Sequence, residues 1–185
     1  MNKIAMITGA TSGIGLGTAK ALASEGFNLI LTGRRNDRLE NIKKEIEEKY
    51  KVKVLILCFD VRNQSEVEKA VSSLSAEWKN IDVLVNNAGL AVGLEPIQEG
   101  LIEDWERMID TNVKGLLYVT RAVSPMMCSR KSGHIVNICS TAGKEVYPNG
   151  NVYCATKHAV DALSKAMRQD MLPYGIKVTN ICPGA

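Results

Sequence analysis

Histidine is scarce in this chain, and its cysteines lack the spacing of a metal site. Only His134 and His158 occur among 185 residues, and the five cysteines show neither paired spacing nor accompanying histidines. Zinc sites are built from such pairs, so we expect no metal. Three cysteines fall in or beside apolar runs, where a reduced thiol behaves as a small buried hydrophobe: Cys58, Cys139 and Cys182. The other two are Cys128 and Cys154.

Long hydrophobic runs and a strong charge imbalance are also missing. No stretch approaches the roughly 18 apolar residues of a membrane span, and Met1 leads directly into an apolar strand candidate, which leaves no room for a signal peptide. We therefore expect a cytoplasmic protein. The net charge is only +3 and the basic residues are scattered, which argues against a nucleic-acid partner.

The composition is that of a soluble globular protein. Hydrophobic residues make up 45% and charged residues 23% of the chain. A length of 185 residues suits one domain with a substantial core and is too short for two ordinary ones. We expect a single domain over residues 1–185.

Short β-branched runs alternate with longer helical patterns along the chain. Several runs are apolar on both faces, as in parallel strands that are covered by helices above and below. Five helical stretches separate the strands, which predicts a doubly wound α/β sheet. The predicted strands are residues 4–8, 28–32, 52–59, 81–85, 134–139 and 176–181.

The C-terminal part predicts a helix over residues 152–172, which Pro173 and Gly175 end. One more strand follows, and the chain then stops at Pro183-Gly184-Ala185. Pro-Gly normally turns a chain onward after a buried strand. We therefore expect a further C-terminal segment that this sequence lacks.

A glycine-rich turn follows the first strand and opens a helix. Glycines let the backbone approach a pyrophosphate, and the helix N-terminus offers unpaired N–H groups. A glycine cluster alone would also suit a mere tight turn, but strand, glycines and helix occur here in the order of a nucleotide site. The predicted phosphate-binding residues are Gly9, Thr11, Ser12, Gly13, Ile14 and Gly15.

The second strand ends at Arg34 and Arg35 without the acidic residue that holds an NAD ribose. Two guanidiniums can hold a 2′-phosphate through charge-assisted bonds, which predicts NADP. The alternative is that both arginines cap a surface turn.

Two further strand ends supply candidate cofactor contacts. Asp60 can accept a hydrogen bond from the adenine while Val61 packs beside it, although Asp60 can instead be a helix N-cap. After the fourth strand, Asn87, Ala88 and Gly89 predict backbone that passes close to the nicotinamide. The alternative for these asparagines is a simple turn.

Tyr153 and Lys157 stand four residues apart on a predicted helix, thirteen residues after Ser140. This spacing places both side chains on one helix face about one turn apart, so the ammonium favours the ionised phenol. Taken one at a time, the three residues have ordinary structural alternatives: an interfacial tyrosine, a solvated lysine and a serine at a strand end. His158 points about 100° away from Lys157, which predicts a surface or packing residue.

Together these residues resemble the short-chain dehydrogenase/reductase family. The resemblance covers the whole chain and rests on the glycine turn, Asn86-Asn-Ala-Gly89, Asn112, the Ser140, Tyr153 and Lys157 set, and Pro183-Gly184. It implies the strand order 3-2-1-4-5-6 and places Pro183 and Gly184 at the cofactor. The family's substrate lid and last edge strand would follow Ala185.

The resemblance also implies roles for the four catalytic candidates. Tyr153 would be the general acid or base, and Lys157 would hold the nicotinamide ribose. Ser140 would stabilise charge on the substrate oxygen, and Asn112 would keep a water beside Lys157 for proton relay.

Within the family, the chain is most similar to NADP-dependent dehydrogenases of small 3-hydroxy acids such as serine, allo-threonine and 3-hydroxypropionate. A substrate carboxylate needs a clamp, which cannot be identified among Lys144, Arg34 and Arg35. Alternatives are a reductase of 3-oxoacyl thioesters or bulkier ketones, and an NADP-binding sensor or interaction protein without turnover.

Two helical regions carry more apolar residues than a single sheet-facing stripe requires. We expect their second faces to pack in a homodimer or homotetramer, whereas the alternative is burial within one chain. The regions are residues 105–127 and 152–171, with Met126, Met127, Ala155, Ala159, Ala162 and Ala166.

Overall fold

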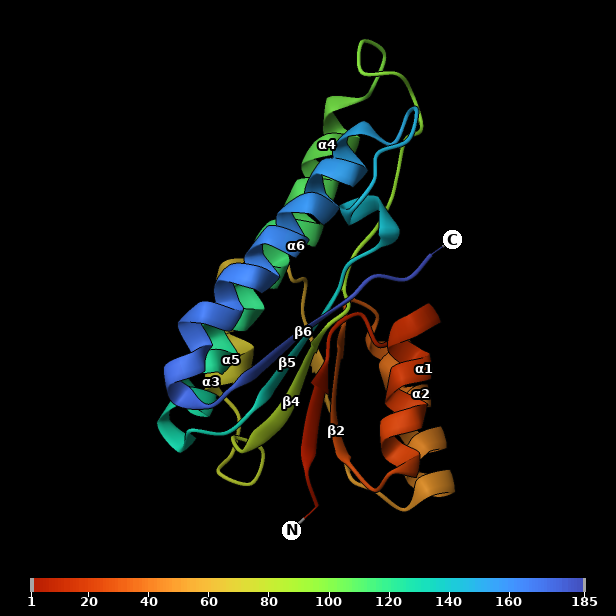
Figure 1. Ribbon diagram of the computed structural model, residues 1–185. Helices are drawn as coiled ribbons and strands as arrows, with labels where there is room; N and C mark the ends of the chain where they lie inside the picture. Colours follow the sequence, from red (N-terminus) through yellow and green to blue (C-terminus); the bar gives the residue numbers. More distant parts are fainter. Residues whose placement is uncertain (1, 185) are drawn as a thin grey trace.

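The computed structural model describes residues 2–184, in which six parallel strands form one sheet with helices on both faces (Figure 1). The strand order is β3-β2-β1-β4-β5-β6, which confirms the predicted doubly wound topology. The strands are β1 Ile4–Ile7, β2 Asn28–Gly33, β3 Val54–Cys58, β4 Ile81–Asn86, β5 His134–Ile138 and β6 Lys177–Ile181. Each predicted strand is therefore confirmed to within two residues at either end.

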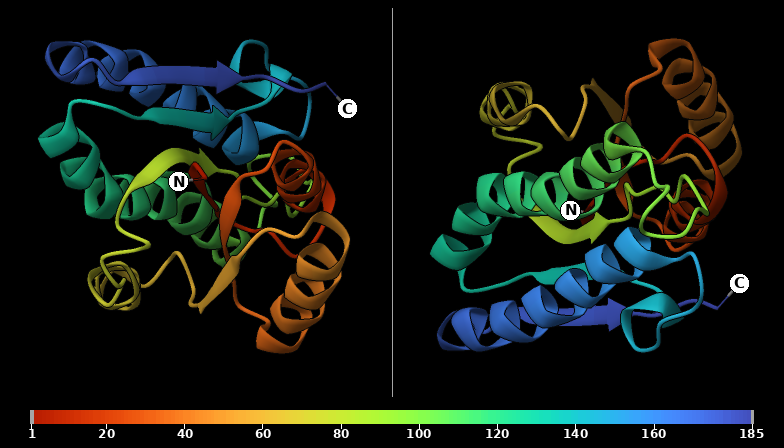
Figure 2. Two further views of the ribbon diagram at one scale, coloured as in Figure 1. Left: turned by 90° about the horizontal axis from the view of Figure 1, so that it is seen from below. Right: turned by 90° about the horizontal axis from the view of Figure 1, so that it is seen from above.

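The helices cover the two faces of the sheet as separate layers. Helices α1 and α2 lie on one face, and α3, α5 and α6 lie on the other (Figures 1 and 2). The helices are α1 Gly13–Ser24, α2 Asn36–Tyr50, α3 Gln64–Ser72, α4 Ile102–Ile109, α5 Leu116–Arg130 and α6 Asn151–Met171. The described residues also form three short helical segments of other types. These are the π-helix η1 Asp110–Gly115 and the 3-10 helices η2 Thr141–Gly143 and η3 Leu172–Tyr174.

Two hydrophobic clusters form the core, one on each face of the sheet. Met6, Ile30 and Leu84 belong to the larger cluster under α3, α5 and α6, whereas Ile7 and Leu31 belong to the cluster under α1 and α2. Neighbouring residues of one strand thus face opposite layers, and all four residues of β1 are buried. This explains why several strands read as continuous apolar runs.

Helix α6 ends close to the predicted point. The 3-10 turn η3 contains Pro173, and Gly175 then adopts the left-handed region at φ +67°. Before α6, the chain runs helically from Ile102 to Arg130 through α4, η1 and α5. Among residues 2–184, no helix combines the length and apolar character that a membrane crossing requires.

Two burial predictions need correction. Cys58 is exposed, because it is the last residue of the edge strand β3, whereas Cys139 is buried as predicted and Cys182 is partly covered. Met127 is fully buried in the core of its own chain, so it cannot contribute to a subunit interface. Met126 and Ala159 are partly covered, and Ala155, Ala162 and Ala166 are exposed as the interface prediction requires.

Candidate active site

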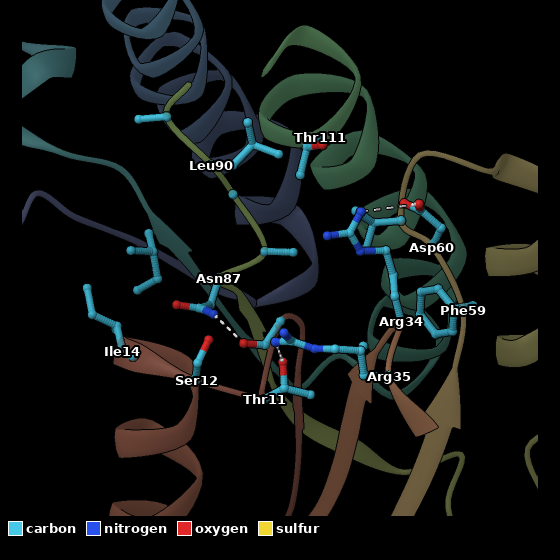
Figure 3. A pocket seen from close by; sticks show the side chains of 18 of the residues that line it. Thr11, Ser12, Ile14, Arg34, Arg35, Phe59, Asp60, Asn87, Leu90 and Thr111 are labelled. Carbon is cyan, nitrogen blue, oxygen red and sulfur yellow. Dashed lines mark hydrogen bonds and ion pairs between the residues drawn. The ribbon is translucent and has the colours of Figure 1, made fainter. Parts of the chain in front are cut away.

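A cavity of about 450 Å³ opens at the carboxyl ends of β1 to β5 (Figure 3). Parallel strands bring their carboxyl ends to one edge of the sheet, where doubly wound folds bind ligands. The cavity brings together fourteen residues that the sequence predicted: Gly9, Thr11, Ser12, Gly13, Ile14, Arg34, Arg35, Asp60, Val61, Asn87, Ala88, Gly89, Tyr153 and Lys157.

Five predicted site residues do not line this cavity. Gly15 is buried behind the glycine turn, where an added Cβ would collide with the Asn87 side chain and the Gly9 carbonyl. Pro183 uses its carbonyl to accept a hydrogen bond from the Thr141 N–H at 2.9 Å, and Gly184 is exposed. The other two are Asn112 and Ser140.

The glycine turn is fastened to the end of β4 by side-chain hydrogen bonds. The Thr8 hydroxyl accepts from the N–H groups of Asn87 at 3.0 Å and Ala88 at 2.9 Å. In return, the Asn87 amide donates to the carbonyls of Thr8 at 2.8 Å and Gly9 at 3.1 Å. Asn87 is therefore more than a turn former, because it holds two walls of the cavity together.

Arg34 and Arg35 both extend into the cavity from the end of β2 (Figure 3). Arg35 Nη2 donates to Thr11 Oγ1 at 2.9 Å, and Arg34 Nη1 lies 3.8 Å from Asp60 Oδ2. Arg35 occupies the N-cap position of α2, but its side chain makes no capping bond. The assignment of both arginines to a 2′-phosphate stays a prediction.

Asp60 lies at the end of β3 between two arginines. Arg62 donates to both of its carboxylate oxygens, with Nη2 2.7 Å from Oδ2. Burial would raise the pKa of Asp60, but the Arg62 hydrogen bonds and the Arg62 and Arg34 charges outweigh it and hold that pKa below its ordinary value. The N-cap alternative is wrong, because Asn63 caps α3 by accepting from Ser65 N and Glu66 N.

Tyr153 and Lys157 face the cavity from successive turns of α6. The Lys157 ammonium lies 5.7 Å from the centroid of the Tyr153 ring and donates to the Ile138 carbonyl at 3.0 Å. Lys157 is only 6% exposed, and this burial lowers its pKa because a charged group loses hydration. The Lys157 side chain therefore lies over the Tyr153 ring and is largely shielded from water.

Ser140 follows β5 and begins η2. Its hydroxyl oxygen accepts a hydrogen bond from the Ala142 N–H at 3.1 Å, so the side chain caps this short turn. The hydroxyl proton is not used in that bond. His158 is exposed, as predicted.

Asn112 lies in the π-helix η1 and is 2% exposed. Its amide nitrogen donates to the Leu90 carbonyl at 2.9 Å and the Thr156 hydroxyl at 3.0 Å, and its oxygen accepts from the Leu90 N–H at 2.9 Å. The amide group of Asn112 thus connects the cavity wall at Leu90 with α6 at Thr156. A role in binding water beside Lys157 stays a prediction.

Several cavity residues escaped the sequence analysis. Phe59, Ile138 and Cys139 line it from strand ends, and Leu90 lines it just after the Asn86-Asn-Ala-Gly89 stretch. Their position next to predicted strand ends was the available signal. Thr111 reaches the cavity from η1, whose π-helical geometry no motif predicted.

The family model of the short chain dehydrogenases matches residues 3–185. The chain belongs to this family. The resemblance inferred from the sequence is thereby confirmed, and the strand order of this short chain dehydrogenase agrees with it.

Curated relatives of this short chain dehydrogenase cover nearly its whole length. The NADP-dependent 3-hydroxy acid dehydrogenase YdfG of Salmonella typhi is 50% identical over 181 residues, which are 98% of this chain and 71% of the relative. A probable NADP-dependent dehydrogenase of Haemophilus influenzae is 43% identical over 97% of this chain and 70% of its own.

Solved structures agree with this family assignment. Serine dehydrogenase from Escherichia coli superposes with a TM-score of 0.93 at 49% identity, over 98% of this chain and 82% of that one. The closed form of serine dehydrogenase complexed with NADP+ gives a TM-score of 0.92 at 48% identity, over 98% and 71% of the two chains.

Proposed function

We propose that the protein is an NADP-dependent oxidoreductase that transfers a hydride between nicotinamide and a small 3-hydroxy acid. One observation carries the chemistry: Tyr153 and Lys157 face, from one side of α6, a cavity that also contains the glycine turn. The other site residues and the family membership support the same reaction class.

The cavity has the features that NADP requires. The glycine turn exposes backbone at the N-terminus of α1, which suits a pyrophosphate. Arg34 and Arg35 suit a 2′-phosphate, and no carboxylate stands at the end of β2 to favour an unphosphorylated ribose. The names of the relatives from Salmonella typhi and Haemophilus influenzae, and the NADP+ complex of serine dehydrogenase, support this choice.

Bound NADP would supply the hydride acceptor, and residues of this chain would move the proton. In alcohol oxidation, the Tyr153 phenolate takes the hydroxyl proton of the substrate, and in carbonyl reduction the phenol returns it. The Lys157 cation stabilises the phenolate. Ser140 donates a hydrogen bond to the substrate oxygen, where negative charge develops.

The choice of 3-hydroxy acids rests on the relatives. One relative is named for 3-hydroxy acids and one solved structure for serine, and serine is itself an acid with a hydroxyl on carbon 3. A 3-oxoacyl thioester or bulkier ketone reductase would share Ser140, Tyr153 and Lys157. Substrate profiling separates these two reaction classes. If the enzyme recognises a substrate carboxylate, its turnover of the corresponding ester should be lost.

The test follows NADP reduction by absorbance in the full-length gene product with L-serine, L-allo-threonine and 3-hydroxypropionate. Tyr153→Phe removes the proton carrier and is expected to abolish turnover. Tyr118→Phe is the matched control, because Tyr118 lies on α5 outside the cavity. Turnover that survives in Tyr153→Phe would overturn the mechanism. No turnover of any 3-hydroxy acid, with ketones still reduced, would overturn the substrate class alone.

A further inference from the structure

We propose that Thr156 is a positioning residue: its hydroxyl fastens the turn of α6 that carries Tyr153 and Lys157 to Asn112 and thus to the cavity wall. The inference rests on the proposed function, because it gives Thr156 a task only if Tyr153 carries the proton. Thr156 is 2% exposed and does not line the cavity. It therefore acts through other residues.

The Thr156 hydroxyl has one proton, and the structure shows where it goes. Thr156 Oγ1 donates to the carbonyl of Tyr153 at 2.8 Å. In an α-helix that same carbonyl accepts the N–H of the residue four positions later, which is Lys157. The bond thus lies within the single turn that separates the two candidate catalytic side chains.

Because the proton is used within α6, Thr156 Oγ1 presents lone pairs to its other neighbours. The Asn112 amide nitrogen donates to this oxygen at 3.0 Å. A hydroxyl that bonds only its own helix is common in helices, but here the oxygen also receives a bond from η1. Thr156 therefore connects two elements that are distant in the sequence.

Asn112 extends this connection to the cavity. Its amide group pairs with both the N–H and the carbonyl of Leu90, each at 2.9 Å, and Leu90 lines the cavity. An added Cβ on Gly89 would lie 3.3 Å from Asn112 Oδ1 and 3.7 Å from Lys157 Nζ. The chain of contacts from Tyr153 through Thr156 and Asn112 therefore ends on the wall next to Lys157.

The inference predicts a defect in the chemical step. Thr156→Val keeps the branched shape but removes the hydroxyl, so α6 is no longer held in register with the wall. We expect kcat to fall by about tenfold to a hundredfold, since small displacements of reacting groups are costly. NADP affinity should be unchanged, and Thr156→Ser should restore kcat because it keeps the hydroxyl.

A matched control separates positioning from general stability. Thr120 on α5 is 5% exposed, and its hydroxyl accepts from the Asn86 amide at 2.9 Å. Neither residue lines the cavity. Thr120→Val also removes a buried hydroxyl that accepts from an asparagine. It is expected to lower the melting temperature as Thr156→Val does, but to leave kcat unchanged.

The experiment measures kcat, KM, NADPH affinity and the primary deuterium isotope effect for whichever substrate the wild type turns over. A slower hydride step in Thr156→Val should raise the isotope effect on kcat, whereas a smaller folded fraction would not. If Thr156→Val does not fold, Thr156→Ala carries the same test. Wild-type kcat and isotope effect in the folded variant, with Tyr153→Phe inactive, would overturn this inference alone. An active Tyr153→Phe would overturn the proposed mechanism first.

Discussion

Gly9 adopts a left-handed backbone, with φ +64°, where the glycine turn passes the end of β4. A Cβ there would lie 2.9 Å from the Ala88 Cα, which is backbone and cannot move aside. We expect Gly9→Ala to weaken NADPH binding and lower the melting temperature. Fluorescence titration and thermal unfolding would measure both.

Gly17 is the control for this substitution. It lies within α1 with nothing within 4 Å of an added Cβ, so Gly17→Ala should stabilise the protein by about 1 kcal/mol through helix propensity. If both variants bound NADPH as the wild type does, Gly9 would have no special role at the cofactor.

The two arginines at the end of β2 give a second prediction at the residue scale. Charge-assisted hydrogen bonds contribute about 1.5–3 kcal/mol each, so Arg34→Ala or Arg35→Ala should weaken NADPH binding roughly tenfold to a hundredfold. NADH lacks the 2′-phosphate, so its affinity should change little. Parallel titrations with both cofactors check this. An equal loss for NADH and NADPH would contradict the assignment of these side chains to the phosphate.

At the scale of elements, the sequence predicts most of what local patterns control. Several strands are visible because they are apolar on both faces. Helix α6 ends at Met171, just before Pro173 and Gly175, whose backbone preferences are local. The prediction that Cys58 is buried was wrong because burial at the end of an edge strand depends on neighbours in space. The π-helix η1 and the pairing of Asn112 with Leu90 and Thr156 likewise depend on tertiary contacts.

Asp161 connects three elements near the carboxyl end of the sheet. From α6, its carboxylate accepts hydrogen bonds from Lys144 after η2 at 2.6 Å and from Asn180 on β6 at 2.9 Å, and pairs with Lys165 at 2.7 Å. The hydrogen bonds from Lys144 and Lys165 lower the pKa of Asp161 from 3.8 to about 2. The ionised form is therefore favoured in the folded state.

This lowered pKa predicts how the stability of the protein depends on pH. Since the pKa of Asp161 is lower in the folded state, its contribution is fully present above pH 3.8 and is lost as the pH falls to about 2. Asp161→Asn should be less stable at neutral pH, and its unfolding free energy should fall less between pH 4 and about 2. Urea unfolding at both pH values measures this. An identical pH slope in both proteins would show that Asp161 does not contribute.

At the scale of the whole molecule, the two faces of the sheet differ in what covers them. Helices α1 and α2 cover one face, and the other face carries the layer with α3, α4, α5 and α6 (Figure 1). Several apolar side chains of this second layer are exposed. Ile109 is 41% exposed and Leu117 38% exposed on this layer, and Ala162 and Ala166 are exposed on α6. Because these side chains are exposed, we still predict a subunit interface on this layer, but Met127 is not part of it.

A charge in this layer should therefore prevent assembly. Ala162→Glu places a carboxylate on the exposed face of α6, where burial against a second subunit would cost several kcal/mol without a partner charge. Ala21→Glu, on the exposed face of α1 across the sheet, is the matched control. Light scattering after gel filtration should give an oligomer for the wild type and Ala21→Glu, and a monomer for Ala162→Glu. A monomeric wild type would contradict the homo-oligomer, and an oligomeric Ala162→Glu would place the interface elsewhere.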